Sequence, residues 1–281
     1  MEPTLNGPPV ARKPLTWNIV GRDHADIAMI SRWPAVVPPD LAWGAATGRG
    51  VRVCIMDSGV EGDHPLVGPI QGSWAVQDQP DGSKSVVPVE PGDSSGHGTA
   101  CASVVRAVAP DCEIHSLRVL GQGLSGSGDA LLTGLKWAIA QRYPVVNMSL
   151  STTRQKFVDS LRTLTDEAYF NKTLLVASAH NMPVESFPWR FASVISVGSH
   201  EESDPLTFYY NPNPPVEFFG RGLDLDVAWL GGGTLRCTGN SFATPHIAAI
   251  CALVMAKHPD LTPFQLKSVL SQTAANAQGA A

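Results

Sequence analysis

Three short motifs carry side chains that could take part in chemistry together. Asp57 directly follows an apolar run, so its carboxylate would stand at the end of a strand. His97 is flanked by Gly96 and Gly98, which let other backbone segments approach the ring. Ser241 lies at a predicted loop-to-helix junction, where free N–H groups stabilise an oxyanion. Taken singly, a turn aspartate, a structural histidine and a serine helix cap would explain the same residues.

The elements that must position these residues alternate between strand and helix patterns. Apolar runs of strand length occur at 51–56, 114–119, 145–149 and 174–179. Helical patterns occur at 40–46, 97–108, 129–142, 154–170 and 241–258, and a last helix is predicted to begin with Thr262, Pro263 and Gln265 as capping residues. The segment 62–96 is predicted as a polar loop and 199–233 as a loosely structured region. The alternation predicts an α/β fold with three α/β/α layers and a mostly parallel central sheet, in which functional residues lie at the carboxyl ends of strands.

The composition excludes several classes of protein. The 281 residues include 20 Lys+Arg and 25 Asp+Glu, a formal net charge of −5, so no basic stripe for nucleic acid or anionic lipid is predicted. With 43% hydrophobic and 16% charged residues, the chain is not disordered as a whole and can form one large domain. No segment has the length and apolarity of a membrane span, and the first thirty residues contain no apolar stretch typical of a signal peptide. We therefore expect neither a nucleic-acid partner nor a membrane partner.

The cysteines indicate thiol rather than disulfide chemistry. Five cysteines are present, an odd number, and they are widely spaced without a CxxC pair. Neither a disulfide framework nor a zinc knuckle is therefore predicted, and reduced, mostly buried thiols are expected. Cys101 follows His97 by one helical turn and is interpreted as an apolar filler.

The three motifs also match a known family. Asp57, His97 and Ser241 occur in the chain order of subtilisin-like serine proteases. Further stretches look like segments of that family, namely 116–121, 136–139, 146–150, 187–188, 193–198 and 257–259. The sequence therefore resembles the subtilisin-like serine proteases, or subtilases, from about residue 41 to its C-terminal helix. The resemblance implies a peptidase domain over 41–281 and an N-terminal extension over 1–40 that is shorter than a full prodomain.

The resemblance assigns roles to four catalytic residues. Ser241 would attack the scissile carbonyl, His97 would accept its proton, and Asp57 would orient the imidazole and stabilise its charged form. Asn181 would donate from its side-chain amide to the oxyanion, together with the Ser241 backbone N–H. The implied activity is that of a serine endopeptidase that hydrolyses peptide bonds through an acyl-enzyme on Ser241.

The resemblance also implies where a substrate would lie. An extended peptide would pair with two backbone edges and enter a specificity pocket, for which the expected residues are Leu124, Ser125, Gly126, Ser149, Leu150, Ser151, Thr152, His180 and Ser186. Ser151, Thr152 and His180 stand where the family usually has glycines. A narrower and more polar pocket is therefore expected. His180 would either favour an acidic or polar residue before the cut or support neighbouring residues by hydrogen bonding without touching the substrate.

Two further departures from the family bear on the site. Asn240 replaces the threonine that usually precedes the nucleophile and is expected to keep a donor near the oxyanion. The chain after His97 is short, and Leu66 stands where a calcium-ligating aspartate would be. Because a hard cation needs six or more oxygen ligands, no metal and no other cofactor are expected.

These observations lead to one functional hypothesis and two alternatives. The missing signal, the short extension, the cysteines and the narrowed pocket favour a cytoplasmic processing protease of restricted specificity. Its expected partner is a peptide or protein substrate, with a precursor peptide as the specific hypothesis. One alternative is a transamidating peptide macrocyclase of the same fold, in which an amine resolves the acyl-enzyme. The other is a catalytically silent module that uses the same groove to bind peptides.

Overall fold

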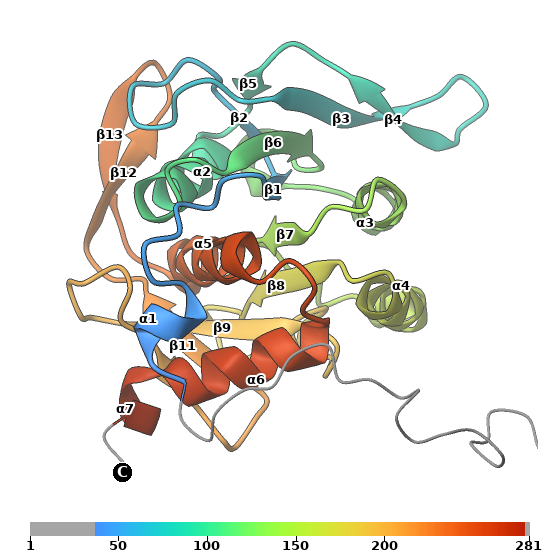
Figure 1. Cartoon of the computed structure of the whole chain (residues 1–281). Helices are drawn as coiled ribbons and strands as arrows, with labels where there is room; N and C mark the ends of the chain where they lie inside the picture. The colour runs from blue at the N-terminus through green and yellow to red at the C-terminus, as the bar shows by residue number, and fades with distance from the viewer. Residues whose placement is uncertain (1–36, 279–281) are drawn as a thin grey trace, which may run out of the picture. The chain divides into compact units, whose positions relative to one another are not determined.

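A nine-stranded sheet forms the centre of the computed structural model, which describes residues 37–278 (Figure 1). Its strands are, in spatial order, β10 (Tyr209–Tyr210), β11 (Phe218–Arg221), β9 (Ile195–His200), β8 (Leu174–Ser178), β7 (Val145–Met148), β1 (Arg52–Asp57), β6 (Glu113–Arg118), β3 (Gly72–Asp78) and β4 (Lys84–Pro88). All neighbours from β11 to β3 pair in parallel, and only the two edge strands are antiparallel. Most of the expected extension 1–40 lies outside the described residues.

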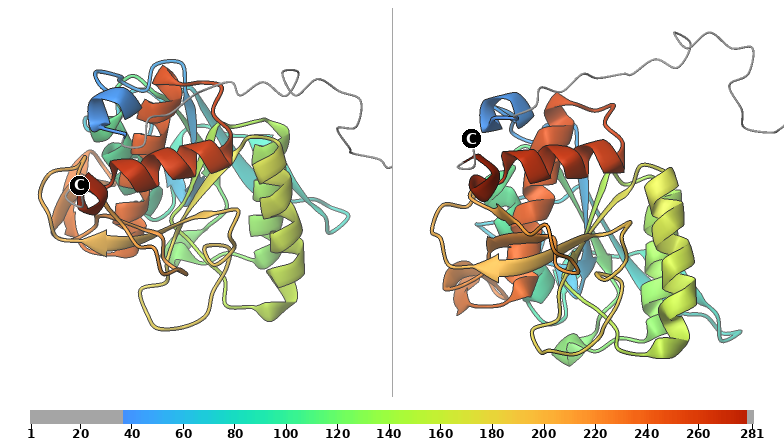
Figure 2. Two further views of the ribbon diagram at one scale, coloured as in Figure 1. Left: turned by 60° about the horizontal axis from the view of Figure 1, so that its bottom comes forward. Right: turned by 90° about the horizontal axis from the view of Figure 1, so that it is seen from below.

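Helices cover both faces of this sheet, as Figures 1 and 2 show. One face packs against α2 (His97–Val108), α5 (Asn240–Lys257) and α6 (Pro263–Thr273), and the other against α3 (Gly128–Ala140) and α4 (Val158–Phe170). The short helices α1 (Pro39–Ala42) and α7 (Ala275–Gln278) are the remaining α-helices of the described part. The expected three-layer α/β/α fold with a mostly parallel sheet is confirmed.

Burial on both sides explains the apolar composition of the central elements. Five of the six residues of β1 are buried, as expected for a strand that is covered on both faces. Helix α5 buries every residue from Phe242 to Val254, because it packs against α2 and against several strands of the sheet. The helix that carries Ser241 is therefore a central support of the domain.

Two predictions about loops are wrong. The segment 62–96 contains β3, β4 and β5 (Gly92–Asp93), and β5 pairs with β2 (Gly59–Val60). The segment 199–233 includes β10, β11 and β12 (Leu225–Trp229), and β12 forms a hairpin with β13 (Gly233–Cys237). The polar composition of these segments reflects strands at the edges of sheets, where one face or both meet solvent.

Two predicted helices differ in extent. The helix expected at 40–46 is the four-residue α1, and the helical pattern at 154–170 begins with a 3₁₀ turn, η3 (Gln155–Phe157), before α4. The helices expected at 97–108, 129–142 and 241–258 are present as α2, α3 and α5. No helix among residues 37–278 combines the length and apolarity that crossing a membrane requires.

The parallel strands bring the candidate residues to one edge of the sheet. Asp57 is the last residue of β1, Ser149 follows β7, and Asn181 follows β8. The first turn of α5, with Ser241, contacts the same edge through Ser149. The segments that carry these side chains are far apart in the sequence but meet where the strands end.

Candidate active site

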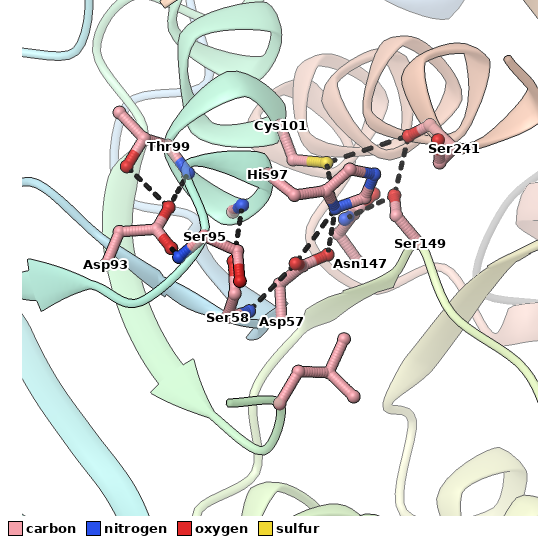
Figure 3. A network of polar contacts seen from close by, with 12 residues as sticks. Asp57, Ser58, Asp93, Ser95, His97, Thr99, Cys101, Asn147, Ser149 and Ser241 are labelled. Carbon is pink, nitrogen blue, oxygen red and sulfur yellow. Dashed lines mark hydrogen bonds and ion pairs between the residues drawn. The ribbon is translucent and has the colours of Figure 1, made fainter. Parts of the chain in front are cut away.

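The centre of the site is a buried pair of side chains, Asp57 and His97 (Figure 3). The His97 Nδ1 lies 2.9 Å and 3.0 Å from the two carboxylate oxygens of Asp57. Asp57 is fully buried, and its Oδ1 also accepts a 2.8 Å hydrogen bond from the backbone N–H of Ser58. Because Nδ1 faces the carboxylate, it carries the hydrogen, and Nε2 is left as the acceptor.

The charge of Asp57 controls the protonation of His97. Burial disfavours the imidazolium, but the Asp57 carboxylate and the neighbouring Cys101 together outweigh this effect and raise the pKa of His97 above its usual value of 6.5. The ring of Phe242 covers His97, with 5.3 Å between the ring centroids. The pair can therefore accept a proton at Nε2 and stabilise the resulting positive charge.

The start of α2 is built so that His97 can approach Asp57. A Cβ added to Gly98 would lie 2.0 Å from the carbonyl oxygen of Gly59, so only glycine fits at this position. The carboxylate of Asp93 accepts hydrogen bonds from the backbone N–H and the hydroxyl of Thr99, at 2.8 Å and 2.7 Å. This carboxylate compensates the free N–H groups at the start of the helix.

Ser241 lies in the first turn of α5, where Pro245 alters the hydrogen bonding. In a regular helix the carbonyl of Ser241 would accept from the N–H of residue 245, but proline has no N–H. The Ser149 hydroxyl donates to this carbonyl instead, at 2.7 Å, and the Cys101 thiol lies 3.6 Å from it. Asn147 Nδ2 in turn donates to the Ser149 hydroxyl at 3.1 Å.

This network makes Ser149 and Asn147 positioning residues for the nucleophile. Both are buried, and Asn147 is fully so. Burial also raises the pKa of the Cys101 thiol, which keeps it protonated and able to donate weakly. Within residues 37–278 no hydrogen bond joins the Ser241 hydroxyl to His97, although both side chains line the same cleft. Such contacts often tighten only when substrate is bound.

The oxyanion donor expected at Asn181 lies beside the nucleophile. Asn181 Oδ1 accepts from the backbone N–H of Asn240 at 3.0 Å, which leaves the Nδ2 donor available. A Cβ added to Gly239 would lie 3.4 Å from both Asn181 Nδ2 and Ser241 Oγ, so the two atoms flank this glycine. Asn181 can thus donate to an oxygen that is bound next to Ser241.

The side chain of Asn240 contacts the ends of two strands. Its Nδ2 donates to the carbonyl of Ala179 at 3.2 Å, and its Oδ1 accepts from the hydroxyl of Ser199 at 2.7 Å. Asn240 thus ties the start of α5 to the ends of β8 and β9. Because the amide nitrogen carries two hydrogens and this contact uses one, the expectation of a donor near the oxyanion stays a prediction.

A cleft of about 330 Å³ joins these residues to most of the predicted substrate-binding residues. Its lining includes His97, Asn181 and Ser241 together with Leu124, Gly126, Ser149, Leu150, Ser151, Thr152 and His180. Two predicted residues are placed elsewhere. Ser125 lines an adjoining hollow, and Ser186 is fully buried, where its hydroxyl accepts from Trp189 Nε1 at 2.8 Å.

The cleft also contains residues that the sequence did not suggest. Arg154 lines it, as do Ser127, which caps α3, and Gly128 and Leu131 at the start of that helix. No motif marks Arg154, which lies in an irregular segment just before η3. Its place became evident only from the fold, because the pairing of Thr152 with Phe187 holds that segment against the cleft.

The side chains do not assign a metal to this site. Asp57, His97 and Cys101 are the only cluster of three or more His, Cys, Asp or Glu ligand atoms within 4.8 Å of one another in the described part of the chain. The Asp57–His97 hydrogen bond already uses Nδ1 and the carboxylate, and the Cys101 thiol is protonated. Leu66 carries no ligand atom, and the expectation of no calcium there stays a prediction.

Comparison with known proteins agrees with this geometry. The model of the subtilase family matches residues 48–281. The minor extracellular protease Epr of Bacillus subtilis (strain 168) is 31% identical over 240 residues, which are 80% of this chain and 35% of Epr. Subtilisin E of the same organism is 28% identical over 254 residues, which are 84% of this chain and 63% of subtilisin E. The chain thus spans less than two thirds of the length of these relatives.

Solved structures give the same result for the fold. A cold-adapted subtilisin-like serine proteinase aligns with a TM-score of 0.68 and 27% identity, covering 83% of this chain and 87% of that protein. Sphericase aligns with a TM-score of 0.69 and 22% identity, covering 86% of this chain and 91% of that protein, and supports the fold alone. The family model, the relatives and the arrangement of Asp57, His97 and Ser241 together show that this chain belongs to the subtilase family.

Proposed function

We propose that this protein is a serine endopeptidase that cleaves peptide bonds through an acyl-enzyme on Ser241. The observation that carries the proposal is the buried Asp57–His97 pair, with 2.9 Å between Nδ1 and Oδ1, in the same cleft as a serine at the start of a helix. Paired groups of this kind activate a hydroxyl that is otherwise a weak nucleophile.

The geometry supports the following reaction. The Ser241 hydroxyl attacks the scissile carbonyl carbon, and its proton passes to Nε2 of His97 while Asp57 stabilises the imidazolium. Asn181 Nδ2 and the backbone N–H of Ser241 donate to the oxyanion. His97 then protonates the leaving amine, and water attacks the acyl-enzyme with His97 again as the base. The serine and the neutral histidine are thereby regenerated.

The substrate of the proposed enzyme is an extended peptide. Leu124 and Gly126 lie on one side of the cleft, and Ser149, Leu150 and Ser151 follow β7 on the other. A peptide between these two edges forms main-chain hydrogen bonds as an added strand would. The residues before the scissile bond lie along both edges. Affinity then depends little on sequence, and selectivity comes from the side chains that line the cleft.

Restricted specificity and a processing role belong to the same proposal. Ser151, Thr152 and His180 fill space in the cleft, and the backbone of Thr152 is fixed by hydrogen bonds of 2.8 Å and 2.9 Å to Phe187. Because the backbone of Thr152 is fixed, this side of the cleft excludes substrate side chains that do not fit. Substrates that carry such side chains make fewer contacts in the transition state and are cleaved more slowly. We accordingly propose a precursor peptide or protein as the substrate.

We also propose a cytoplasmic location for this protein. It is supported by the five cysteines, all of which are free thiols and four of which are buried. The relative Epr is named an extracellular protease, so the compartment must be measured independently. Fractionation of the native host, with detection of the protein in each fraction, tests this point.

One experiment separates the proposed activity from its two alternatives. The wild-type protein is treated with a serine-directed fluorophosphonate and, in parallel, with a proteome-derived peptide library whose products are sequenced. Labelling that disappears in Ser241→Ala, together with new termini, supports the endopeptidase. Cyclic or ligated products identify a transamidase, and the absence of labelling in a folded protein identifies a silent binding module. Poor digestion of casein is expected, whereas rapid cleavage at many unrelated sites contradicts restricted specificity.

A further inference from the structure

Arg154 is the one arginine among the residues that line the cleft. Its backbone N–H donates to the Thr152 hydroxyl at 3.2 Å, and Thr152 is itself paired with Phe187 through two backbone hydrogen bonds. The side chain therefore projects from a fixed segment. Arg154 also lines the adjoining hollow that contains Ser125, so it lies at the junction of the two cavities.

The guanidinium of Arg154 has no acceptor in the described part of the chain. No hydrogen bond or ion pair from this group occurs within residues 37–278. The residues that line the cleft include no Asp or Glu, and the Asp57 carboxylate behind His97 is fully buried. A chain with a formal net charge of −5 thus exposes a cation and no carboxylate in its cleft. This local charge is opposite to that of the chain as a whole.

His180 adds a second unused donor to the same cleft. Its Nδ1 accepts from the backbone N–H of Met182 at 3.0 Å, so the hydrogen is on Nε2 in the neutral ring. That N–H has no partner among the described residues, and His180 lines the same cleft as Arg154. Two donors without acceptors face the space that a substrate side chain would enter.

The adjoining hollow extends this donor character away from Ser241. The Lys156 ammonium lies 4.7 Å from the centroid of the Phe157 ring, and both residues line the hollow with Arg154. Asp129 is its single carboxylate, and no ion pair within 4.0 Å joins it to either cation in residues 37–278. The two cations therefore outnumber the one acid at this end of the groove.

We propose that Arg154 selects substrates that carry an aspartate or glutamate on the acyl side of the scissile bond. The inference deepens the proposed endopeptidase function and rests on it. A carboxylate matches the guanidinium because both are planar and form two parallel hydrogen bonds. His180 lines the cleft and offers a hydrogen-bond donor, whereas Lys156 lines the adjoining hollow and disfavours a cationic side chain there. The substrate class is thus a peptide with an acidic residue shortly before the cut.

Paired peptides test the preference in the wild-type protein. Quenched fluorescent peptides are built on a sequence that the enzyme cleaves, with Glu or its isostere Gln at each of the four positions before the cut. Because Arg154 is exposed, the pair contributes on the order of 1 kcal/mol, and Glu is expected to raise kcat/KM about fivefold at one position. The preference should shrink as salt is raised, since exposed charges are screened. Equal rates for Glu and Gln at all four positions would overturn the proposal.

Charge reversal identifies the residue responsible. Arg154→Glu should cancel or reverse the preference, so that Lys is accepted in place of Glu at the same position. Arg49→Glu is the matched control, because it changes the net charge equally at an exposed arginine that pairs with Asp111 and does not line the cleft. A preference for Glu that survives in Arg154→Glu contradicts the assignment.

Fluorophosphonate labelling keeps the two proposals distinguishable. A separate sample of each variant is labelled alongside the kinetic measurements, which shows that the variant is folded with a reactive Ser241. Labelling and cleavage without an acidic preference refute the role of Arg154 alone. Failure of the wild-type protein to label and to cleave refutes the endopeptidase function itself.

Discussion

The replacement of Ser149 by alanine tests how the nucleophile is held. Pro245 removes the helical donor for the Ser241 carbonyl, and the Ser149 hydroxyl supplies one at 2.7 Å. Ser149→Ala deletes this donor and leaves the Cys101 thiol, 3.6 Å away, as the remaining one. The thiol is a weak donor, so the carbonyl becomes largely unsatisfied in a region with little solvent.

The size of the effect follows from these contacts. Loss of a partner for a buried carbonyl costs about 1–3 kcal/mol, and the remaining thiol contact places Ser149→Ala near the lower half of that range. Relaxation of the first turn of α5 also moves the Ser241 hydroxyl relative to His97. Misplacement of a reacting group on the ångström scale costs up to about 100-fold in rate, so we expect kcat to fall about 10- to 100-fold with little change in KM.

The assay compares unfolding free energies in urea with kcat and KM on one cleaved peptide. Ser196→Ala is the matched control, because the Ser196 hydroxyl is also buried, donates to the Pro215 carbonyl at 2.7 Å and accepts from Glu217 N at 2.9 Å. Ser196 does not line the cleft. The Ser196→Ala variant should lose a similar free energy of unfolding, while its kcat/KM stays within about twofold of the wild-type value.

A second substitution provides a rescue. Pro245→Ala restores an N–H at the position from which a regular helix would donate to the Ser241 carbonyl. In the Ser149→Ala background it should recover part of kcat, which a double-mutant cycle would report as a favourable coupling. If Ser149→Ala loses stability like Ser196→Ala but keeps its kcat, the positioning role is refuted.

The remaining predictions concern the Asp57–His97 pair, the oxyanion donor, a buried histidine and metal dependence. Asp57→Asn should lower kcat about 10⁴-fold and shift the acidic limb of the pH–rate profile to lower pH, because the carboxylate raises the pKa of His97. Asn181→Ala should lower kcat about 10²- to 10³-fold with little effect on unfolding. Burial lowers the pKa of His246 to about 4, so the unfolded chain binds this proton first, and about 3 kcal/mol of stability should be lost as pH falls from 6.5 to 4. His246→Gln should flatten that part of the stability profile measured in urea. EDTA should leave activity and Tm unchanged, and a fall of several degrees would contradict the absence of a structural metal.

The sequence was most informative where local chemistry determines local structure. The capping residues Thr262 and Gln265 predicted the start of α6, and both reciprocal hydrogen bonds are present, at 3.3 Å and 2.9 Å. The apolar run before Asp57 predicted a doubly covered strand, and β1 lies near the middle of the sheet. In these cases the signal depends on residues that are neighbours in the chain.

Other features depend on contacts between distant segments and left no local signal. The hairpin of β3 and β4 forms one end of the sheet, which explains its polar residues. No residue of the hairpin predicts that position by itself. The contacts of the Asn240 amide with Ala179 and Ser199 are one case, because both partners lie far before it in the chain. Arg154 enters the cleft for a similar reason, since its position depends on the pairing of Thr152 with Phe187.

The same division separates the parts of the site that resist substitution from those that tolerate it. Asp57, Asn147 and Ser149 are buried at strand ends and hold their neighbours through hydrogen bonds, so changes there cost both stability and rate. Arg154 is exposed, and only its backbone N–H takes part in holding its segment in place. Its side chain can therefore be exchanged at little cost to folding. Specificity in this protein can change through such residues while the geometry of Ser241 and His97 stays fixed, which is why charge reversal at Arg154 should yield a folded enzyme with an altered preference rather than an inactive one.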